Sequence, residues 1–300
     1  MYRSKITSKL LRWYRRHGRD LPWRHTRDPY KILVSEIMLQ QTQVSRVVDF
    51  YAAWLKQFPT WKVLADASNA EVIRAWSGLG YNRRALVLRD IAREIVTHGV
   101  PINREGWLTL KGIGPYTSAA VSVFSARERT FPIDTNTRRV VGRIFLGQLF
   151  PDPSRDQEIY TIATRELMQS SKFDDVVQAL FDLANVHCTK RPLCETCPLR
   201  DVCASSKTFL SASVQTPKRM TKKANERKHR NKPFPDRIYR GRILKTVQDT
   251  HTVSVTKLGP LVDPSFDPKL DASWLHAMVK RLEKDGMVNT NNNHVTLCSK

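Results

Sequence analysis

Four of the five cysteines are close enough in the sequence to bind one metal centre. Cys188, Cys194, Cys197 and Cys203 span sixteen residues in the pattern C-x5-C-x2-C-x5-C, and Cys298 lies alone near the C-terminus. Four thiolates at this spacing can surround either a zinc ion or an iron–sulfur cluster, and the spacing does not choose between them. Five cysteines are too few for a disulfide-stapled secreted scaffold, so we expect a reducing compartment.

Two carboxylic acids stand where acid–base chemistry is possible. Glu36 lies in the apolar stretch KILVSEIML (31–39). If this residue is buried, its pKa is raised and it can hold a proton near neutral pH. The alternative is an exposed glutamate on the polar side of a helix. Asp134 follows Pro132 and Ile133 and is either a helix N-cap or a second catalytic carboxylate.

The segment LKGIGPYTSA (110–119) predicts a DNA-binding hairpin between two helices. Gly112 and Gly114 allow a sharp backbone turn, and Pro115 suits the first turn of a helix. Backbone amides at the start of such a helix bind phosphate without reading a base. A plain turn between helices is the alternative, and the basic character of the chain favours the helix-hairpin-helix interpretation.

The charge balance predicts a polyanionic partner. The chain has 50 Lys and Arg against 28 Asp and Glu, a formal net charge of +22. Residues 1–27 and residues 205–235 each hold nine basic residues and one acid, and together supply +16 of that charge. Nucleic acid is the first partner to consider and an anionic membrane the second. No run approaches the roughly 18 apolar residues of a membrane-spanning helix, and we expect no secretory signal.

The spacing of apolar residues predicts a mostly helical protein in three parts. Residues 1–205 show helical apolar spacing nearly throughout, as at Ile6, Leu10, Trp13 and Tyr14. Residues 206–235 lack apolar periodicity and are expected to form a basic linker. Residues 236–300 are expected to form a small winged-helix-like α+β module. Its predicted elements are a helix at Ile238–Val247, a helix through Leu275–Leu282 and a β-hairpin turning at Asn291–Asn293.

Five segments together resemble the adenine DNA glycosylases of the MutY type. They are DPYKILVSEIMLQQTQV (28–44), GLGYNRRA (78–85), LKGIGPYTSAA (110–120), DTNTRRV (134–140) and the cysteine loop. They occur in the order of that family and cover about the first 205 residues. The resemblance implies a two-lobed helix-hairpin-helix glycosylase fold with DNA in the cleft. It also implies a [4Fe-4S] cluster bound by the four cysteines.

The resemblance also implies the reaction. The family removes adenine mispaired with 8-oxoguanine or guanine, which begins base-excision repair. Glu36 is similar to the proton donor to adenine N7, Asp134 to the carboxylate that stabilises the sugar cation, and Asn136 to a residue that holds this carboxylate. Tyr116 stands where bifunctional relatives such as endonuclease III carry a lysine. Without that amine no Schiff base can form, so a monofunctional hydrolase is expected.

Further positions are similar to DNA contacts of the family. Gln41 and Tyr81 resemble residues that wedge into the base stack, and Thr42 is expected near the opposite 8-oxoguanine. The full set of expected DNA contacts is Gln41, Thr42, Tyr81, Gly112, Gly114, Lys190 and Arg191. The expected partner is double-stranded DNA with a mismatched adenine, bound by a monomer in the cytoplasm, at the nucleoid if the source is bacterial.

The sequence departs from the family pattern in several places. The first cysteine gap has five residues where six are usual. Lys111 replaces the usual proline of the hairpin, Thr135 replaces a glycine after the aspartate, and Asn82 replaces a second tyrosine. Residues 236–300 show no likeness to the Nudix-like domain with which the family inspects 8-oxoguanine.

Two other functions are compatible with parts of the sequence. A T:G mismatch thymine glycosylase of the same superfamily also carries a tyrosine at position 116 and lacks a Nudix-like domain, but Glu36 and the LQQT segment (39–42) argue against it. A non-catalytic iron–sulfur DNA-binding regulator would suit the winged-helix-like module. That function would leave Glu36 and Asp134 unexplained.

Overall fold

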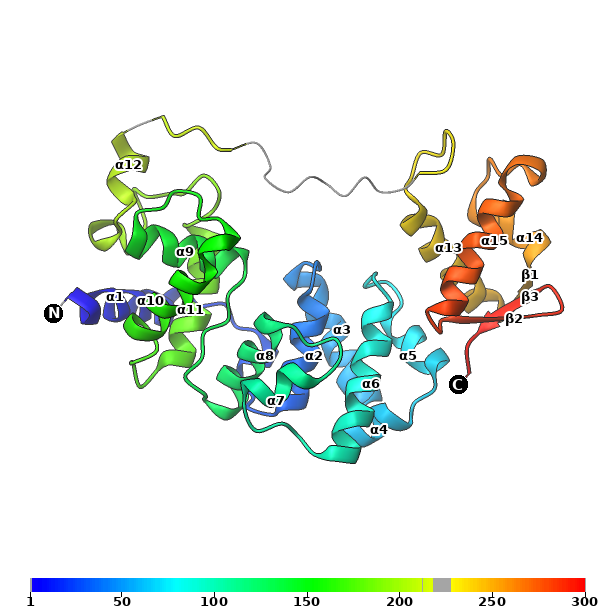
Figure 1. Ribbon diagram of the computed structural model, residues 1–300, viewed down its shortest axis with the longest axis horizontal. Coiled ribbons are helices and arrows are strands. Elements are labelled where there is room, and N and C mark those ends of the chain that lie inside the picture. Colours follow the sequence, from blue (N-terminus) through cyan, green and yellow to red (C-terminus); the bar gives the residue numbers. More distant parts are fainter. Residues whose placement is uncertain (1, 212, 218–227, 300) are drawn as a thin grey trace. The chain divides into compact units, whose positions relative to one another are not determined.

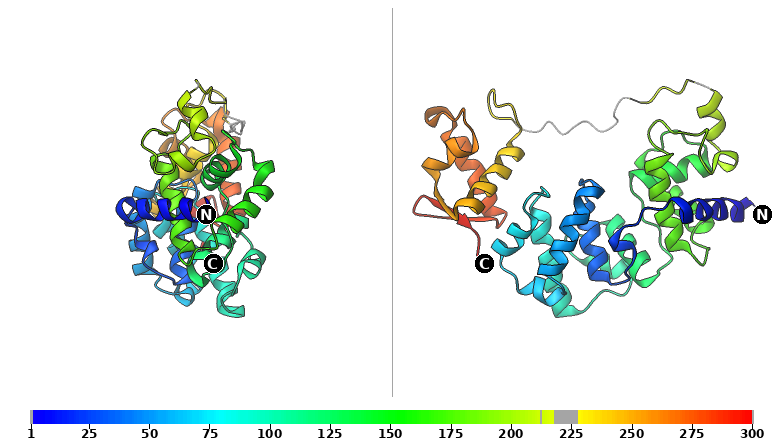
Figure 2. Two further views of the ribbon diagram at one scale, coloured as in Figure 1. Left: turned by 90° about the vertical axis from the view of Figure 1, so that its left-hand side faces the viewer. Right: turned by 180° about the vertical axis from the view of Figure 1, so that it is seen from behind.

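The chain folds into two units built mainly from helices. The computed structural model describes residues 2–211, 213–217 and 228–299. Unit 1 comprises Met1–Glu36 and Pro101–Met220, and unit 2 comprises Ile37–Val100 and Thr221–Lys300. The boundary falls within helix α2 (Pro29–Leu39). Helices dominate both units (Figures 1 and 2), which confirms the mostly helical fold expected from the apolar spacing.

The expected three-part division of the chain stays a prediction. The structure places helix α12 (Ser206–Ser211) at the start of the segment expected to be a linker. The most basic part of that segment, which contains Lys218, Arg219, Lys222 and Lys223, lies outside the described residues.

Unit 1 carries the hairpin, the cysteine loop and the helices around them. Its further α-helices are α1 (Tyr2–His17), α7 (Arg104–Thr109), α8 (Pro115–Val121), α9 (Thr135–Leu146), α10 (Asp156–Glu166) and α11 (Phe173–Val186). Short helical turns occur at η1 (Pro22–Arg24), η2 (Ser122–Ala126), η3 (Pro153–Arg155) and η4 (Arg200–Val202). The turn η2 is π-helical and continues α8.

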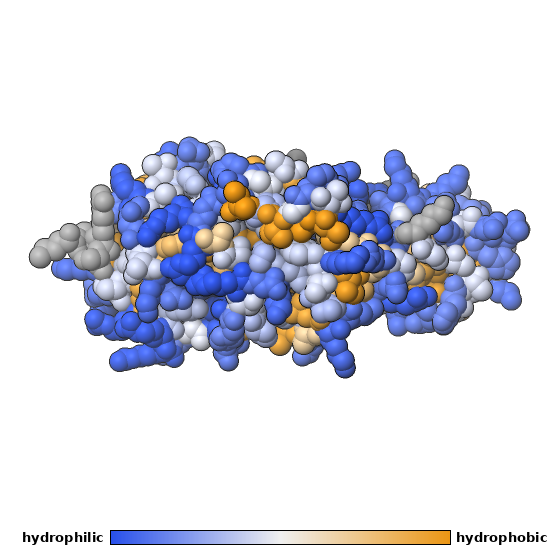
Figure 3. Space-filling model, turned by 90° about the horizontal axis from the view of Figure 1, so that it is seen from below, coloured by the Kyte–Doolittle hydropathy of each residue, from blue (hydrophilic) through white to orange (hydrophobic). Residues whose placement is uncertain are grey.

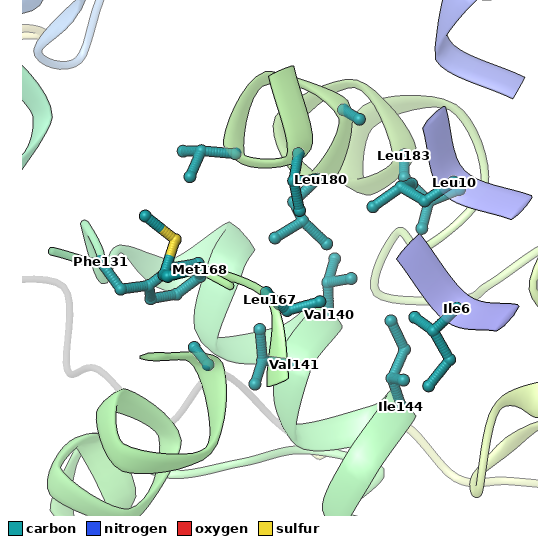
Figure 4. Packing of buried hydrophobic residues seen from close by; sticks show 14 of the residues in the cluster. Ile6, Leu10, Phe131, Val140, Val141, Ile144, Leu167, Met168, Leu180 and Leu183 are labelled. Atoms are coloured by element: carbon teal, nitrogen blue, oxygen red, sulfur yellow. The ribbon is translucent and has the colours of Figure 1, made fainter. Parts of the chain in front are cut away.

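The core of unit 1 lies between α1, α9 and α11. Figure 4 shows Ile6 and Leu10 of α1 near Leu183 of α11 and Ile144 of α9. All four are buried, because the apolar faces of three amphipathic helices pack together. A fully buried carboxylate, Asp182 of α11, accepts hydrogen bonds from the side chains of Arg19 and Arg24 and so ties the segment after α1 to this core.

Unit 2 combines four helices after α2 with the C-terminal part of the chain. The helices are α3 (Val44–Gln57), α4 (Trp61–Asp66), α5 (Asn69–Trp76) and α6 (Arg83–His98). Helix α5 begins with a capping box, in which Ser68 and Glu71 satisfy each other's backbone amides. Trp54 and Trp76 pack edge to face in the core, with ring centroids 5.3 Å apart.

The C-terminal module has the element order of a winged helix. Its elements are α13 (Asp236–Thr250), β1 (Thr252–Ser254), α14 (Val255–Val262), α15 (Pro268–Lys284), β2 (Val288–Asn291) and β3 (His294–Leu297). The strands form an antiparallel sheet in the order β1-β3-β2. The helices lie on this small sheet, as the orange and red ribbons of Figures 1 and 2 show. The expected small α+β module is therefore confirmed.

The details of the module agree with the sequence except for helix α14 and strand β1, neither of which was predicted. Asn292 and Asn293 both have positive φ, 45° and 62°, which is the backbone of the tight hairpin turn that asparagine favours. Strand β1 was not predicted, because three residues of the type Thr-Val-Ser are too short to show alternation. It forms only because β3 offers a free edge for pairing.

The surface agrees with the composition. Most residues on the face shown in Figure 3 are hydrophilic, as expected for a chain in which 26% of residues are charged. Within the described residues, no helix has both the length and the apolar character needed to cross a membrane.

Candidate active site

The hairpin of unit 1 begins helix α8 as its sequence predicts. Gly112 has φ of +99°, a backbone conformation that side chains with a Cβ rarely adopt. Gly114 is the N-cap of α8, and Pro115 occupies the first helical position. One residue further along α8, the hydroxyl of Tyr116 donates a hydrogen bond to the carboxylate of Glu36. The hairpin therefore positions a phenol directly at the candidate catalytic acid.

Glu36 is buried within helix α2. It lies in the run from Ile32 to Met38, whose members are all buried, and its own side chain is only 8% exposed. Burial is the largest cause that raises the pKa of Glu36 from its ordinary 4.5 to about 7. The charge of Asp134 adds to the rise, and the hydrogen bond from Tyr116 opposes it. The expectation of a buried acid is met, and the exposed alternative does not apply.

Asp134 is both a helix N-cap and a neighbour of Glu36. One carboxylate oxygen accepts hydrogen bonds from the backbone amides of Asn136 and Thr137, at 2.9 and 2.7 Å. The other accepts from the side-chain amide of Asn136 at 2.8 Å. The N-terminus of α9 also favours a negative charge at this position. The two interpretations of Asp134 are thus compatible, since capping holds the carboxylate in one orientation.

These residues form two carboxyl groups in different environments. Glu36 sits in an apolar helix and takes up a proton near pH 7. Asp134 is held by several donors at a helix terminus. Pairs of carboxyl groups whose environments separate their proton affinities are typical of acid–base catalysis. The arrangement can protonate a leaving group and stabilise a developing positive charge.

Two arginines of α9 join the Asp134 end of the helix to the cysteine loop. Arg139 donates to the side-chain oxygen of Asn136 at 3.1 Å and to the backbone oxygen of Cys188 at 2.6 Å. Arg143, which is 1% exposed, donates to the backbone oxygen of Thr189 at 2.6 Å. It also contacts the sulfur of Cys188 at 3.4 Å. One rigid helix therefore connects the candidate carboxylate with the candidate metal ligands.

The four cysteines line a common cavity. Leu183, Leu199 and Phe209 complete its apolar wall. Burial raises the pKa of Cys197 to about 12 and that of Cys203 to about 11, and the neighbouring thiols contribute to both shifts. Among the described residues, no group of three or more His, Cys, Asp or Glu side chains is arranged to hold a single metal ion. Lys190 and Arg191, between the first two cysteines, are exposed.

In unit 2, a single arginine holds the two loops that carry the expected wedge residues. Arg84 donates to the backbone oxygens of Ile37 at 2.8 Å, Gly80 at 3.0 Å and Gln40, and to the hydroxyl of Thr42 at 3.2 Å. Its guanidinium also lies over the rings of Trp76 and Tyr81, with centroids 5.3 and 5.6 Å away. Arg84 thereby fixes both loops at once.

The expected wedge residues share an unusual backbone conformation. Gln41 and Tyr81 have φ of +57° and +51°, a region that non-glycine residues rarely occupy. Gln41 is exposed and the Tyr81 side chain is 50% exposed. Such strained positions persist where the surrounding structure holds them, often at functional sites.

Sequence reasoning missed the three arginines that organise these groups. No role was expected for them, although Arg84 lies in GLGYNRRA (78–85) and Arg139 in DTNTRRV (134–140), and Arg143 follows soon after. The available signal was an arginine within an otherwise apolar helix face, which is costly unless its donors are satisfied. Arg139 and Arg143 are also four residues apart on α9, so they share one helix face.

Comparison with known proteins identifies the family. A family model described as HhH-GPD superfamily base excision DNA repair protein matches residues 34–161. The adenine DNA glycosylase of Mycobacterium tuberculosis is 36% identical over 282 residues, covering 91% of this chain and 85% of that protein. The chain belongs to the adenine DNA glycosylase family. Enzymes of this family hydrolyse N-glycosidic bonds, so the expected enzyme class is confirmed.

A further adenine DNA glycosylase is similar in sequence, and two solved structures of other DNA repair enzymes share the fold. The human adenine DNA glycosylase is 36% identical over 216 residues, which cover 67% of this chain and 39% of that protein. A thermostable thymine-DNA glycosylase matches with a TM-score of 0.64 and 29% identity, over 69% of this chain and 97% of that one. Endonuclease III bound to DNA matches with a TM-score of 0.57 and 17% identity, over 69% of this chain and 98% of that one. At this identity the match shows a shared fold.

The raised pKa of Glu36 predicts how the stability of this adenine DNA glycosylase depends on pH. Between pH 4.5 and about 7 the unfolded chain loses the Glu36 proton while the folded enzyme keeps it. The contribution of this group to stability is therefore complete below pH 4.5 and is lost as pH rises through 7. We expect Glu36→Gln, which stays neutral, to be more stable than the wild type by up to about 3 kcal/mol at pH 8.5 and equally stable near pH 4.5. Urea unfolding at both pH values measures this, and parallel pH profiles would contradict it.

The contacts of Arg84 predict how a substitution at this position affects adenine release by this adenine DNA glycosylase. Lysine keeps the charge but loses the planar fork, so Arg84→Lys cannot contact both loops at once. We expect adenine release from A:G duplexes under single-turnover conditions to slow by about tenfold or more, equivalent to roughly 1.4 kcal/mol. Arg83→Lys is the matched control, because Arg83 is exposed and pairs only loosely with Asp285 at 3.6 Å. Equal rates for the two variants would show that the Arg84 fork has no such role.

Proposed function

We propose that the protein removes adenine mispaired with 8-oxoguanine or guanine from double-stranded DNA and leaves an abasic site. We propose that it acts as a monomer in the cytoplasm. The observation that carries this proposal is the buried acid Glu36 beside the fixed carboxylate of Asp134. The adenine DNA glycosylases to which the chain is related by sequence support adenine as the excised base.

The chemistry of adenine release requires both carboxyl groups. Adenine is a poor leaving group until its N7 is protonated, and Glu36 carries a proton up to about pH 7. As the base leaves, the sugar develops positive charge. A carboxylate held in place by hydrogen bonds, as Asp134 is by Asn136 and Thr137, stabilises that charge without reorganisation. Water then completes the hydrolysis.

Tyr116 orients the acid and supplies no nucleophilic amine. Its hydroxyl donates to Glu36, and burial raises the pKa of Tyr116 well above its ordinary value, so the phenol keeps its proton. A lysine at this place would form a Schiff base with the sugar. With tyrosine instead, we propose a monofunctional hydrolase that does not nick the abasic strand.

The adenine must leave the base stack before it reaches these carboxyl groups. We propose that Gln41 and Tyr81 fill the space that the base vacates, with Thr42 beside the opposite base. Their positive φ values and the anchoring of both loops on Arg84 support this role, because a backbone held in place presents these exposed side chains in one position. Gly112, Gly114, Lys190 and Arg191 are proposed as backbone phosphate contacts.

We propose that the cysteine loop binds a [4Fe-4S] cluster. All four cysteines line one cavity, and the binding of a cluster would convert these thiols to thiolate ligands with release of their protons. Cys188, Cys194, Cys197 and Cys203 would hold it. When bound, the cluster would fix the loop and so support the exposed Lys190 and Arg191.

A thymine glycosylase acting on T:G mismatches is a second candidate function. The likeness to a solved thymine-DNA glycosylase, at 29% identity, favours it. The buried Glu36 argues for adenine instead, because thymine has no N7 to protonate. The excision assay below separates the two.

The catalytic proposal predicts a defined pattern of base release. On end-labelled duplexes followed by alkali, we expect release from A:8-oxoG and A:G pairs and none from T:G. Glu36→Gln should slow release by roughly 10²–10⁴-fold while duplex affinity changes little, because a neutral amide cannot give its proton to N7. Wild-type release should fall as pH rises above about 7, since the protonated acid is then depleted. Undiminished release by Glu36→Gln, or thymine release, would refute the proposal.

The cofactor proposal predicts iron bound by the cysteine loop. Anaerobically purified protein should contain about four irons per chain and be brown. Cys194→Ser should lose iron and DNA affinity together, whereas Cys298→Ser, which removes the buried cysteine outside the loop, should keep both. One zinc per chain in a colourless, fully active protein would refute this assignment.

A further inference from the structure

We propose that unit 2 contains a groove for the DNA strand opposite the excised adenine, with Arg240 and Arg281 of the C-terminal module as its phosphate contacts. The inference rests on the proposed function, since it takes mismatched DNA as the substrate. It goes beyond that function by giving the winged-helix-like module a defined place in substrate binding.

The groove lies between the two loops of the wedge residues and the module. Its volume is about 610 Å³. One wall includes Gln41, Tyr81 and Arg84, and the opposite wall is formed by side chains of α13 and α15, among them Arg240 and Arg281. All of these residues belong to unit 2. The module therefore extends the surface on which the wedge residues stand.

The two walls are tied together by hydrogen bonds within unit 2. The side-chain amide of Asn69 donates to the backbone oxygen of Gly286 at 2.6 Å. The hydroxyl of Ser77 donates to the side-chain oxygen of Gln248 at 2.7 Å. Asn69 is itself buried. These contacts attach both ends of α5 to the module, which fixes the module within unit 2.

The charge of the groove fits a nucleic-acid backbone. Its lining includes five arginines and a single acid, Asp285. Arg83 pairs with Asp285, and Arg84 is occupied by backbone oxygens. A surface of this sign attracts phosphates strongly.

Among the described residues, Arg240 and Arg281 are the arginines of this wall whose guanidinium groups are not engaged by a hydrogen bond or an ion pair. Neither side chain makes a hydrogen bond or ion pair with the rest of the described chain. Both line the same groove. Burial and the charge of Arg281 lower the pKa of Arg240, while Asp236 and Asp285 oppose this shift without bonding to the guanidinium. Two neighbouring guanidinium groups whose donors are not taken up by a carboxylate can bind a phosphate.

The division of the molecule indicates which DNA strand occupies the groove. The nucleotide that carries the adenine must reach Glu36 and Asp134, which both belong to unit 1. Every residue that lines the groove belongs to unit 2. Within unit 2, Thr42 is the residue that the proposed function places beside the base opposite the adenine, and it is held by Arg84, which lines the groove. We therefore assign the groove to the strand that carries this opposite base.

Binding of a DNA strand in this groove differs from the usual way in which a winged helix binds DNA. In helix-turn-helix proteins the second helix enters the major groove of DNA. The equivalent outward positions of α15 include Lys269 and Lys280, which are exposed and do not line the groove. Arg281 faces the groove instead. The two modes thus use different basic residues of one helix, which makes them separable by mutation.

The first test compares two pairs of charge removals in the full-length protein. Arg240→Gln/Arg281→Gln and Lys269→Gln/Lys280→Gln each remove two positive charges from the module. For duplexes with an A:G pair, we expect only the arginine pair to weaken binding substantially, roughly tenfold, and to reduce the slope of log K against log salt by about 1.8. Thermal unfolding checks that the variants are folded, and Arg281→Gln alone, at an exposed position, serves if the double variant is not.

The second test assigns the strand. Neutral methylphosphonate linkages are placed next to the mismatch, either on the strand opposite the adenine or on the adenine strand. On the opposite strand they should weaken the wild type but have no further effect on Arg240→Gln/Arg281→Gln. On the adenine strand they should weaken both proteins equally.

The outcomes separate this inference from the proposed function. Equal losses for the arginine and lysine pairs, a larger loss for the lysine pair, or additive losses with the opposite-strand methylphosphonates would each overturn the groove assignment. These are binding measurements and do not require excision. Failure of the wild type to release adenine would instead refute the proposed function.

Discussion

The candidate active site depends on keeping one carboxylic acid out of water beside a second carboxylate. Glu36 takes up a proton near pH 7 because its side chain is buried and because Asp134 lies nearby. Desolvation of a charged carboxylate is costly, and two neighbouring carboxylates cannot both ionise freely. The packed core of unit 1 around α1, α9 and α11 supplies stability that offsets this desolvation cost. The result is a carboxyl group that retains its proton up to about pH 7.

Helix α9 links the position of the Asp134 carboxylate to the rest of unit 1. Its N-cap is Asp134, and two turns later Arg139 and Arg143 hold the backbone of the cysteine loop. Because an α-helix is rigid over this length, the position of the carboxylate and that of the loop are coupled. The cysteine loop thus has a mechanical connection to the reaction centre even though its cysteines take no part in proton transfer.

Unit 2 is organised by a different kind of interaction. Arg84 satisfies backbone oxygens from two loops, and these loops hold Gln41 and Tyr81 in conformations that short-range preferences disfavour. The C-terminal module then attaches beside them through Asn69 and Ser77. The carboxyl pair of unit 1 and the exposed loops of unit 2 are therefore held by separate anchors. Loss of one anchor should leave the other intact.

Local patterns in the sequence were enough to predict the helices, the hairpin turn and the residues that carry the candidate chemistry. Apolar spacing identified the helices, two asparagines identified the hairpin turn of the module, and the motifs around Glu36 and Asp134 identified the carboxyl pair. These are local signals, carried by residues a few positions apart. Three features became visible only in the folded protein: Glu36 is buried, Asp134 lies near it, and Arg84 joins two distant loops. Burial and long-range hydrogen bonding depend on which segments meet in space, and no short sequence pattern encodes that.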